Sequence, residues 1–163
     1  MGKALVAYFS ATGTTRGGAE ALAAAIGADL YEIAPAVPYT GRDLDWRDAS
    51  SRSSIEMGDE SSRPAMAGAA PDLSGYEAVF VGFPIWWYVE PRIVDTFLEA
   101  CDLAGKAVIP FATSGGSGLT QAMRRLREVV PPDARVLEGR MMNDGPSAGE
   151  LAAWAEGLGV SAR

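Results

Sequence analysis

Two patterns of apolar residues follow one another along the chain: short continuous runs, and residues spaced three or four positions apart. Short runs with strand character cover Lys3 to Phe9, Asp29 to Ile33, Tyr76 to Gly82, Lys106 to Phe111 and, more weakly, Arg135 to Met141. Between them, apolar residues three or four positions apart predict helices over Thr15 to Ile26, from Pro91 through Cys101, and along Leu119, Ala122, Met123 and Leu126. Strands that alternate with helices form a parallel sheet covered on both faces, so the pattern predicts an α/β fold.

Two signals mark helix ends within this pattern. Gly27 follows the first helical stripe and is expected to end that helix. Ser147 and Glu150 have the spacing of a capping box, which predicts the start of a last helix.

The segment Pro35 to Leu73 interrupts the alternation. It is rich in Arg, Asp, Ser and Pro and occupies a place where a crossover helix would suffice. An irregular segment of this length is uncommon inside a domain, so we expect it to be functional or partly disordered. Its aspartates at 43, 45 and 48 lack the glycine and terminal glutamate of a calcium loop, which favours a solvated loop. We predict a single domain, residues 1–163, with an irregular insertion at about 35–73.

Composition excludes several classes of protein. The longest nearly apolar stretch, Ala78 to Val89, is broken by Gly82 and Pro84 and is shorter than the roughly 18 residues of a membrane helix. The apolar run after Lys3 is too short for a secretory signal, so we expect a cytoplasmic protein. A net charge of -7 argues against a nucleic-acid partner, because binding phosphates requires a basic face.

Cysteine and histidine usage narrows the chemistry further. The single cysteine, Cys101, can form no internal disulfide or thiolate metal cluster, in agreement with a reducing compartment. The sequence contains no histidine, which excludes Ser-His-Asp and Cys-His hydrolysis and most zinc sites.

A hydroxyl-rich turn follows the first predicted strand and opens the first helix. Because the backbone N–H groups at a helix start converge where the helix dipole is positive, this turn predicts a site for a phosphate group. It lacks the lysine of a Walker A loop and the glycine spacing of a dinucleotide fingerprint. The alternative is an N-cap with surplus hydroxyls. The residues concerned are Ser10, Ala11, Thr12, Gly13, Thr14 and Thr15.

This loop resembles the FMN phosphate loop of the flavodoxins. The resemblance covers most of the chain and implies a flavodoxin-like three-layer sandwich with a five-stranded parallel sheet in the order 2-1-3-4-5. It also implies FMN as the cofactor, bound by its phosphate at residues 10–15.

Two further loops should lie beside the first, because ligands of open α/β sheets bind at the carboxyl ends of the strands. Aromatic rings offer stacking faces for the flavin, and glycine-rich turns let backbone amides approach its polar edge. Alternatively, the tryptophans cap the core and the glycine-rich turn is a plain link. The candidate ring contacts are Pro84, Ile85, Trp86, Trp87 and Tyr88 after the third strand, and Thr113, Ser114, Gly115, Gly116 and Gly118 after the fourth.

The resemblance leaves two redox functions open. Flavodoxins pass electrons to a redox protein partner, and we expect this function first. The pairing of "GFPIWW" with "TSGGSG" also resembles NAD(P)H:quinone oxidoreductases, which take NAD(P)H and a small acceptor. Those enzymes place a histidine near the flavin, and here only tyrosines such as Tyr39 or Tyr88 could replace it. A third alternative is a flavin-free module that binds phosphate compounds.

The resemblance also bears on the one-electron-reduced flavin. Flavodoxins stabilise it by a peptide flip beside the ring, usually at a glycine. Here bulky residues, Ile85 to Trp87, occupy that region, and a positive φ would cost each about 1–2 kcal/mol. We therefore expect the protein to stabilise the one-electron-reduced flavin only modestly. The loop after the fourth strand lacks a covering aromatic residue, which leaves the second flavin face open to substrate.

Overall fold

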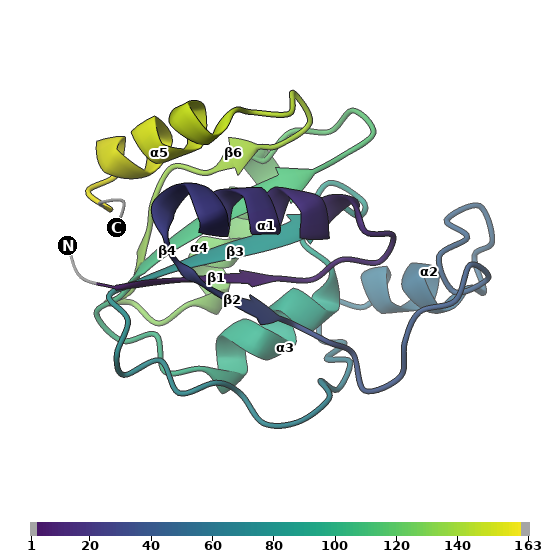
Figure 1. Ribbon diagram of the computed structural model, residues 1–163. Helices are drawn as coiled ribbons and strands as arrows, with labels where there is room; N and C mark the ends of the chain where they lie inside the picture. The colour runs from purple at the N-terminus through teal and green to yellow at the C-terminus, as the bar shows by residue number, and fades with distance from the viewer. Residues whose placement is uncertain (1–2, 161–163) are drawn as a thin grey trace.

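A parallel sheet with helices on both faces forms the centre of the computed structural model, which describes residues 3–160 (Figure 1). The strands are β1 (Ala4–Tyr8), β2 (Asp29–Glu32), β3 (Ala78–Pro84), β4 (Ala107–Thr113), β5 (Arg135–Val136) and β6 (Arg140–Met141). The helices are α1 (Thr14–Ile26), α2 (Arg52–Met57), α3 (Arg92–Ala100), α4 (Thr120–Val129) and α5 (Ala148–Gly157). The strand order β2-β1-β3-β4-β5 confirms the α/β fold and the flavodoxin-like order 2-1-3-4-5. The termini of the predicted domain, residues 1–2 and 161–163, lie outside the described residues.

The helix boundaries agree closely with the sequence signals. Helix α1 begins at Thr14, one residue before the expected position, and Gly27 ends it in the left-handed conformation. The capping box at Ser147 and Glu150 is present at the start of α5, with both of its reciprocal hydrogen bonds. Among the described residues, no helix is long and apolar enough to cross a membrane.

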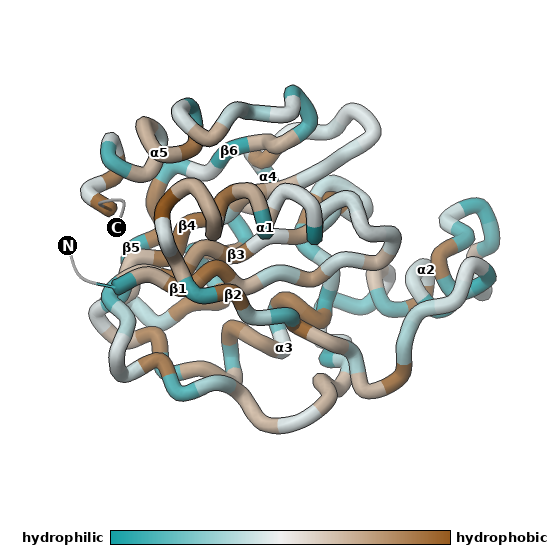
Figure 2. Tube along the Cα trace, viewed as in Figure 1, coloured by the Kyte–Doolittle hydropathy of each residue, from teal (hydrophilic) through white to brown (hydrophobic). Residues whose placement is uncertain are grey.

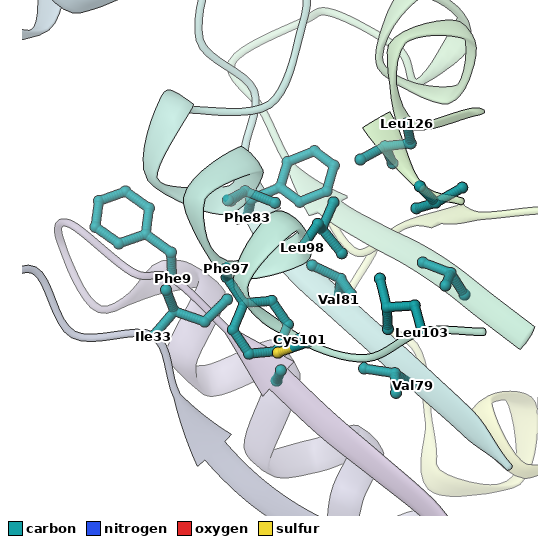
Figure 3. Close-up of a cluster of buried hydrophobic side chains, with 14 of the residues drawn as sticks. Phe9, Ile33, Val79, Val81, Phe83, Phe97, Leu98, Cys101, Leu103 and Leu126 are labelled. Carbon is teal, nitrogen blue, oxygen red and sulfur yellow. The ribbon is translucent and has the colours of Figure 1, made fainter. Parts of the chain in front are cut away.

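Each face of the sheet buries its own hydrophobic cluster, since successive strand residues point to opposite faces. Val79, Val81 and Phe83 of β3 pack with α3 and α4, and Figure 3 shows the centre of this cluster around Phe97 and Leu98. The intervening residues of β3 pack against α1 and α5 on the other face. Figure 2 shows hydrophobic residues concentrated on the central strands, whereas the insertion is largely hydrophilic. Both layers of helices are thereby fixed to the strands that lead into the site.

The predicted fifth strand is divided in two, which corrects the expectation of one strand from Arg135 to Met141. Both β5 and β6 pair with β4, but the four steps from Val136 to Arg140 lie opposite only three steps of β4. The break lies beside Pro110, which has no N–H to give to an edge strand. A side chain at Gly139 would meet the Pro110 carbonyl oxygen at 2.6 Å, so the bulge also requires a glycine.

The insertion is more ordered than the sequence suggested, since it contains α2 and closes at its base. Two backbone hydrogen bonds, from Ala36 to Ala65 and from Ala67 to Ala34, join its ends. Arg92 of α3 anchors α2 by donating from Nη2 to the Met57 carbonyl oxygen at 2.9 Å. The segment predicted to be irregular therefore contains one short helix, α2. The described residues contain no group of three or more acidic, cysteine or histidine side chains that could hold a metal ion.

Candidate functional site

The loops that follow β1, β3 and β4 meet at the carboxyl edge of the sheet. Ile85 donates its backbone N–H to the Thr113 carbonyl oxygen at 2.8 Å, so the second and third loops leave the sheet side by side. Together the loops enclose a hollow of about 320 Å³. It is lined by Ala11, Thr12, Thr14, Thr15, Pro84, Ile85, Trp86, Thr113, Ser114, Gly115 and Asn143.

The first loop turns around the Ser10 hydroxyl. Ser10 Oγ accepts hydrogen bonds from the backbone N–H groups of Gly13 at 3.1 Å and Arg16 at 3.2 Å. Gly13 precedes α1 with a φ of 95°, a conformation that glycine adopts without strain. The N–H groups of Thr14 and Thr15 open the helix and have no partner within it. They lie at the positive end of the helix dipole, which gives the loop the electrostatics of an anion site.

A buried hydrogen bond joins the first loop to the third. The hydroxyl oxygens of Thr15 and Thr113 lie 2.8 Å apart. The neighbouring cation, Arg16, instead forms an ion pair with Glu32 at 3.0 Å and donates to the Tyr8 hydroxyl at 3.2 Å. In this geometry the attraction for an anion comes from the loop backbone and from Thr12 and Thr14, which line the hollow.

The second loop forms a tight two-residue hairpin. Trp86 and Val89 exchange backbone hydrogen bonds of 2.9 and 3.1 Å around Trp87 and Tyr88. Their φ angles of 48° and 71° are both positive, as in a type I′ turn, which normally carries asparagine and glycine. Two bulky residues in this conformation store strain of about 1–2 kcal/mol each. The positive φ expected to be unfavourable in this loop is thus present at Trp87 and Tyr88.

Trp86 is fixed by two other aromatic rings. It meets Phe9 edge to face at 5.6 Å between ring centroids and Tyr39 at 5.5 Å. Tyr39 in turn donates a short hydrogen bond to Glu56 of α2, and the Arg52 guanidinium lies 3.8 Å from its ring centroid. Burial, together with Glu56, raises the pKa of Tyr39 well above its usual value. The insertion, through Tyr39, therefore helps to fix the position of the Trp86 indole.

The third loop is held by Asn143, a residue that the sequence analysis missed. Ser114 donates its N–H to Asn143 Oδ1 at 3.0 Å, and Asn143 Nδ2 donates back to the Ser114 carbonyl oxygen. The Ser114 hydroxyl accepts from the N–H groups of Gly116 at 3.0 Å and Ser117 at 2.7 Å. Gly116 and Gly118 lie in an adjoining hollow that shares Ser114, Gly115 and Asn143 with the first.

Trp87 and Tyr88 lie beside the main hollow rather than in it. They line a second hollow of about 390 Å³ together with Ile85, Trp86, Ser117 and Trp46. Trp46 comes from the insertion and was also missed, because nothing in its sequence surroundings sets it apart from other loop residues. Most of the predicted site residues therefore line these three adjoining hollows, whereas Ser10 and Gly13 shape the first loop without lining them.

The flavodoxin family model matches residues 3–158 of this chain. The chain belongs to the flavodoxin family. A crystal structure of a proposed flavoprotein from Bacteroides eggerthii is 48% identical over 99% of this chain and 100% of that chain, with a TM-score of 0.93. A second crystal structure, of a proposed flavoprotein from Bacteroides uniformis, is 48% identical over 95% of this chain and 98% of that chain, with a TM-score of 0.89. The flavodoxin-like fold is thus shared with these two relatives.

A more distant structure, a flavoprotein from Lactobacillus acidophilus in complex with FMN, is 20% identical over 86% of this chain and 93% of that chain. Its TM-score of 0.70 shows a shared fold. Among curated proteins, no match is found.

Proposed function

We propose that this flavodoxin-family protein binds FMN and transfers electrons through it to a redox partner. The observation that carries the proposal is the common hollow, which is lined by the start of helix α1, the Trp86 indole and Gly115 of the third loop. The FMN complex of the Lactobacillus acidophilus flavoprotein, which has the same fold, supports this cofactor. Bound FMN would supply reversible transfer of one or two electrons.

The residues present fit the parts of FMN. Thr12, Thr14 and the first N–H groups of α1 suit a phosphate dianion, because charge-assisted hydrogen bonds contribute about 1.5–3 kcal/mol each. The Trp86 ring suits an aromatic face, and the backbone around Ser114 and Gly115 suits the polar edge of the flavin. We include a cytoplasmic location in the proposal, in agreement with the single buried cysteine.

A second candidate is an FMN-dependent NAD(P)H oxidoreductase that reduces quinones or similar small acceptors. The hollow lined by Trp46, Trp87 and Tyr88 favours it, because aromatic walls beside the main hollow can admit a planar molecule. Anaerobic mixing of the FMN-loaded protein with NADPH or NADH separates the candidates. Rapid bleaching of the flavin absorbance supports the oxidoreductase, whereas no bleaching with either nucleotide supports a carrier that depends on a protein donor.

The test of FMN binding compares FMN with riboflavin, which lacks the phosphate. The double variant Thr12→Ala/Thr14→Ala should weaken FMN binding at least tenfold and leave riboflavin binding unchanged, as measured by quenching of flavin fluorescence. Thr120→Ala, an exposed threonine outside the hollows, is the matched control. Equal affinity of the double variant and the wild type for FMN would refute the phosphate assignment. Failure of the wild type to bind either flavin would refute the proposed function.

A further inference from the structure

A smaller hollow lies between the insertion and the first two loops of the site. Its volume is about 200 Å³. Pockets for drug-sized ligands occupy roughly 300–1,000 Å³, so this one suits a molecule of one or two rings. It is lined by Ala11, Thr12, Leu44, Trp46, Ser53, Pro84, Trp86 and Trp87.

Ser53 is the unusual residue of this hollow. Its side chain is only 1% exposed, and its hydroxyl has no hydrogen-bond partner within the described residues. Buried polar groups nearly always have a hydrogen-bond partner. A buried polar group without one, in the wall of a hollow, is a place where a ligand atom can form a hydrogen bond. The Ser53 backbone N–H donates to the Asp43 carbonyl oxygen at 3.0 Å, so α2 and the loop that carries Trp46 are held together.

The other walls are aromatic and come from both sides of the hollow. Trp86 and Trp87 belong to the hairpin after β3, and Trp46 belongs to the insertion. Trp46 is 67% exposed and lies with the exposed Trp87 and Tyr88 around the adjoining hollow, so it belongs to an apolar patch of the kind that marks a binding site. Indole walls favour a flat aromatic ligand, which can stack against them. A single hydroxyl in the wall favours a ligand with one polar atom at the edge of its ring.

We propose that this hollow binds a planar aromatic carbonyl compound of one or two rings, whose carbonyl oxygen accepts a hydrogen bond from the Ser53 hydroxyl while Trp46 covers its face. The compound is the electron acceptor of the second candidate function, the FMN-dependent oxidoreductase, on which this inference rests. A quinone of this class takes up two electrons and two protons to become the hydroquinone, and the reduced FMN that supplies them returns to its oxidised form. The insertion thereby supplies the acceptor's binding residues.

The experiment measures equilibrium binding of 1,4-naphthoquinone to the oxidised, FMN-loaded protein by calorimetry, with naphthalene as the ligand that lacks carbonyl groups. Ser53→Ala should weaken naphthoquinone binding about 5- to 10-fold, the effect of one lost hydrogen bond, and leave naphthalene binding unchanged. Trp46→Ala should weaken both ligands at least tenfold. Ile55→Ala, an exposed residue on the same helix as Ser53, is the matched control and should change neither.

The outcomes separate this inference from the proposed function. FMN affinity is measured for every variant, and it should equal that of the wild type. Naphthoquinone binding that Ser53→Ala and Trp46→Ala leave intact would overturn the acceptor site while FMN binding stands. Loss of FMN affinity in these variants would assign the hollow to the cofactor and also overturn the inference. Thermal unfolding checks that Ser53→Ala is folded, and a variant that removes an unpaired hydroxyl should not lose stability.

Discussion

The hydroxyl oxygen of Thr15, at the start of α1, lies 2.8 Å from the hydroxyl oxygen of Thr113, the last residue of β4. Both side chains are buried, at 2% and 7% exposure. This single bond ties the loop assigned to the phosphate to the loop assigned to the flavin edge. The two ends of the proposed cofactor site are therefore set at a fixed distance before any ligand binds.

Thr15→Val should destabilise the protein by about 1–3 kcal/mol, because it leaves the buried Thr113 hydroxyl unpaired. Thr113→Val should do the same for Thr15. The double variant should recover most of the loss, since both partners are then apolar. Urea unfolding of the four proteins without cofactor measures the coupling. Additive losses in the double variant would mean that this hydrogen bond does not stabilise the fold.

Asn143→Ala should weaken FMN and riboflavin binding by the same factor, about tenfold. The substitution removes both hydrogen bonds to Ser114, so the loop that approaches the flavin edge is no longer held in place. Fluorescence titration with both flavins makes the comparison. This pattern differs from the phosphate-loop variants, which should affect FMN alone. A selective loss of FMN affinity would place Asn143 at the phosphate instead.

Tyr88→Asn should stabilise the protein without cofactor by about 1 kcal/mol. Asparagine tolerates the left-handed conformation that Tyr88 adopts at a φ of 71°, and the tyrosine ring is 59% exposed, so little burial is lost. Tyr88→Phe keeps the strain and should leave stability unchanged. Urea unfolding measures both. A Tyr88→Asn protein no more stable than the wild type would show that the turn stores no strain at this position.

A buried cluster of charges lies behind the hairpin. Glu90 and Asp95 are both 0% exposed, and Arg125 of α4 reaches them at 3.3 and 2.8 Å. Burial, reinforced by the hydrogen bond and charge of Asp95, raises the pKa of Glu90 from 4.5 to about 9. Near neutral pH, the folded protein therefore holds a proton on this pair that the unfolded chain has released.

This proton gives stability a pH dependence of definite sign. The contribution of this proton to the free energy of unfolding is fully present below pH 4.5 and is lost as the pH rises through about 9. Glu90→Gln imitates the protonated form, so its stability advantage over the wild type should grow with pH, by up to about 1.4 kcal/mol per pH unit. Thermal unfolding from pH 4 to pH 9 measures the difference, with the exposed Glu128→Gln as the control. Parallel curves for Glu90→Gln and the wild type would contradict the prediction.

The sequence predicted the features that depend on local pattern. The apolar runs gave the positions of the central strands, and the hydroxyl-rich turn indicated which loop opens α1 and lines the main hollow. Residues that act through long-range contacts were not predictable in this way. Asn143 holds Ser114 from a distant strand end, and Ser53 and Trp46 belong to the insertion, which contacts of Arg92 and Tyr39 join to the rest of the fold. No periodicity or spacing encodes such docking.

The division of the last strand into β5 and β6 also affects how the molecule meets other copies of itself. A long, straight edge strand offers a row of unpaired backbone groups to which a strand of another molecule can add. Here the edge beyond β4 consists of two two-residue pieces separated by a bulge at Gly139. Pro110, which interrupts the pairing between β4 and this edge, thereby leaves a strand of another molecule fewer consecutive backbone groups to pair with on this side of the sheet.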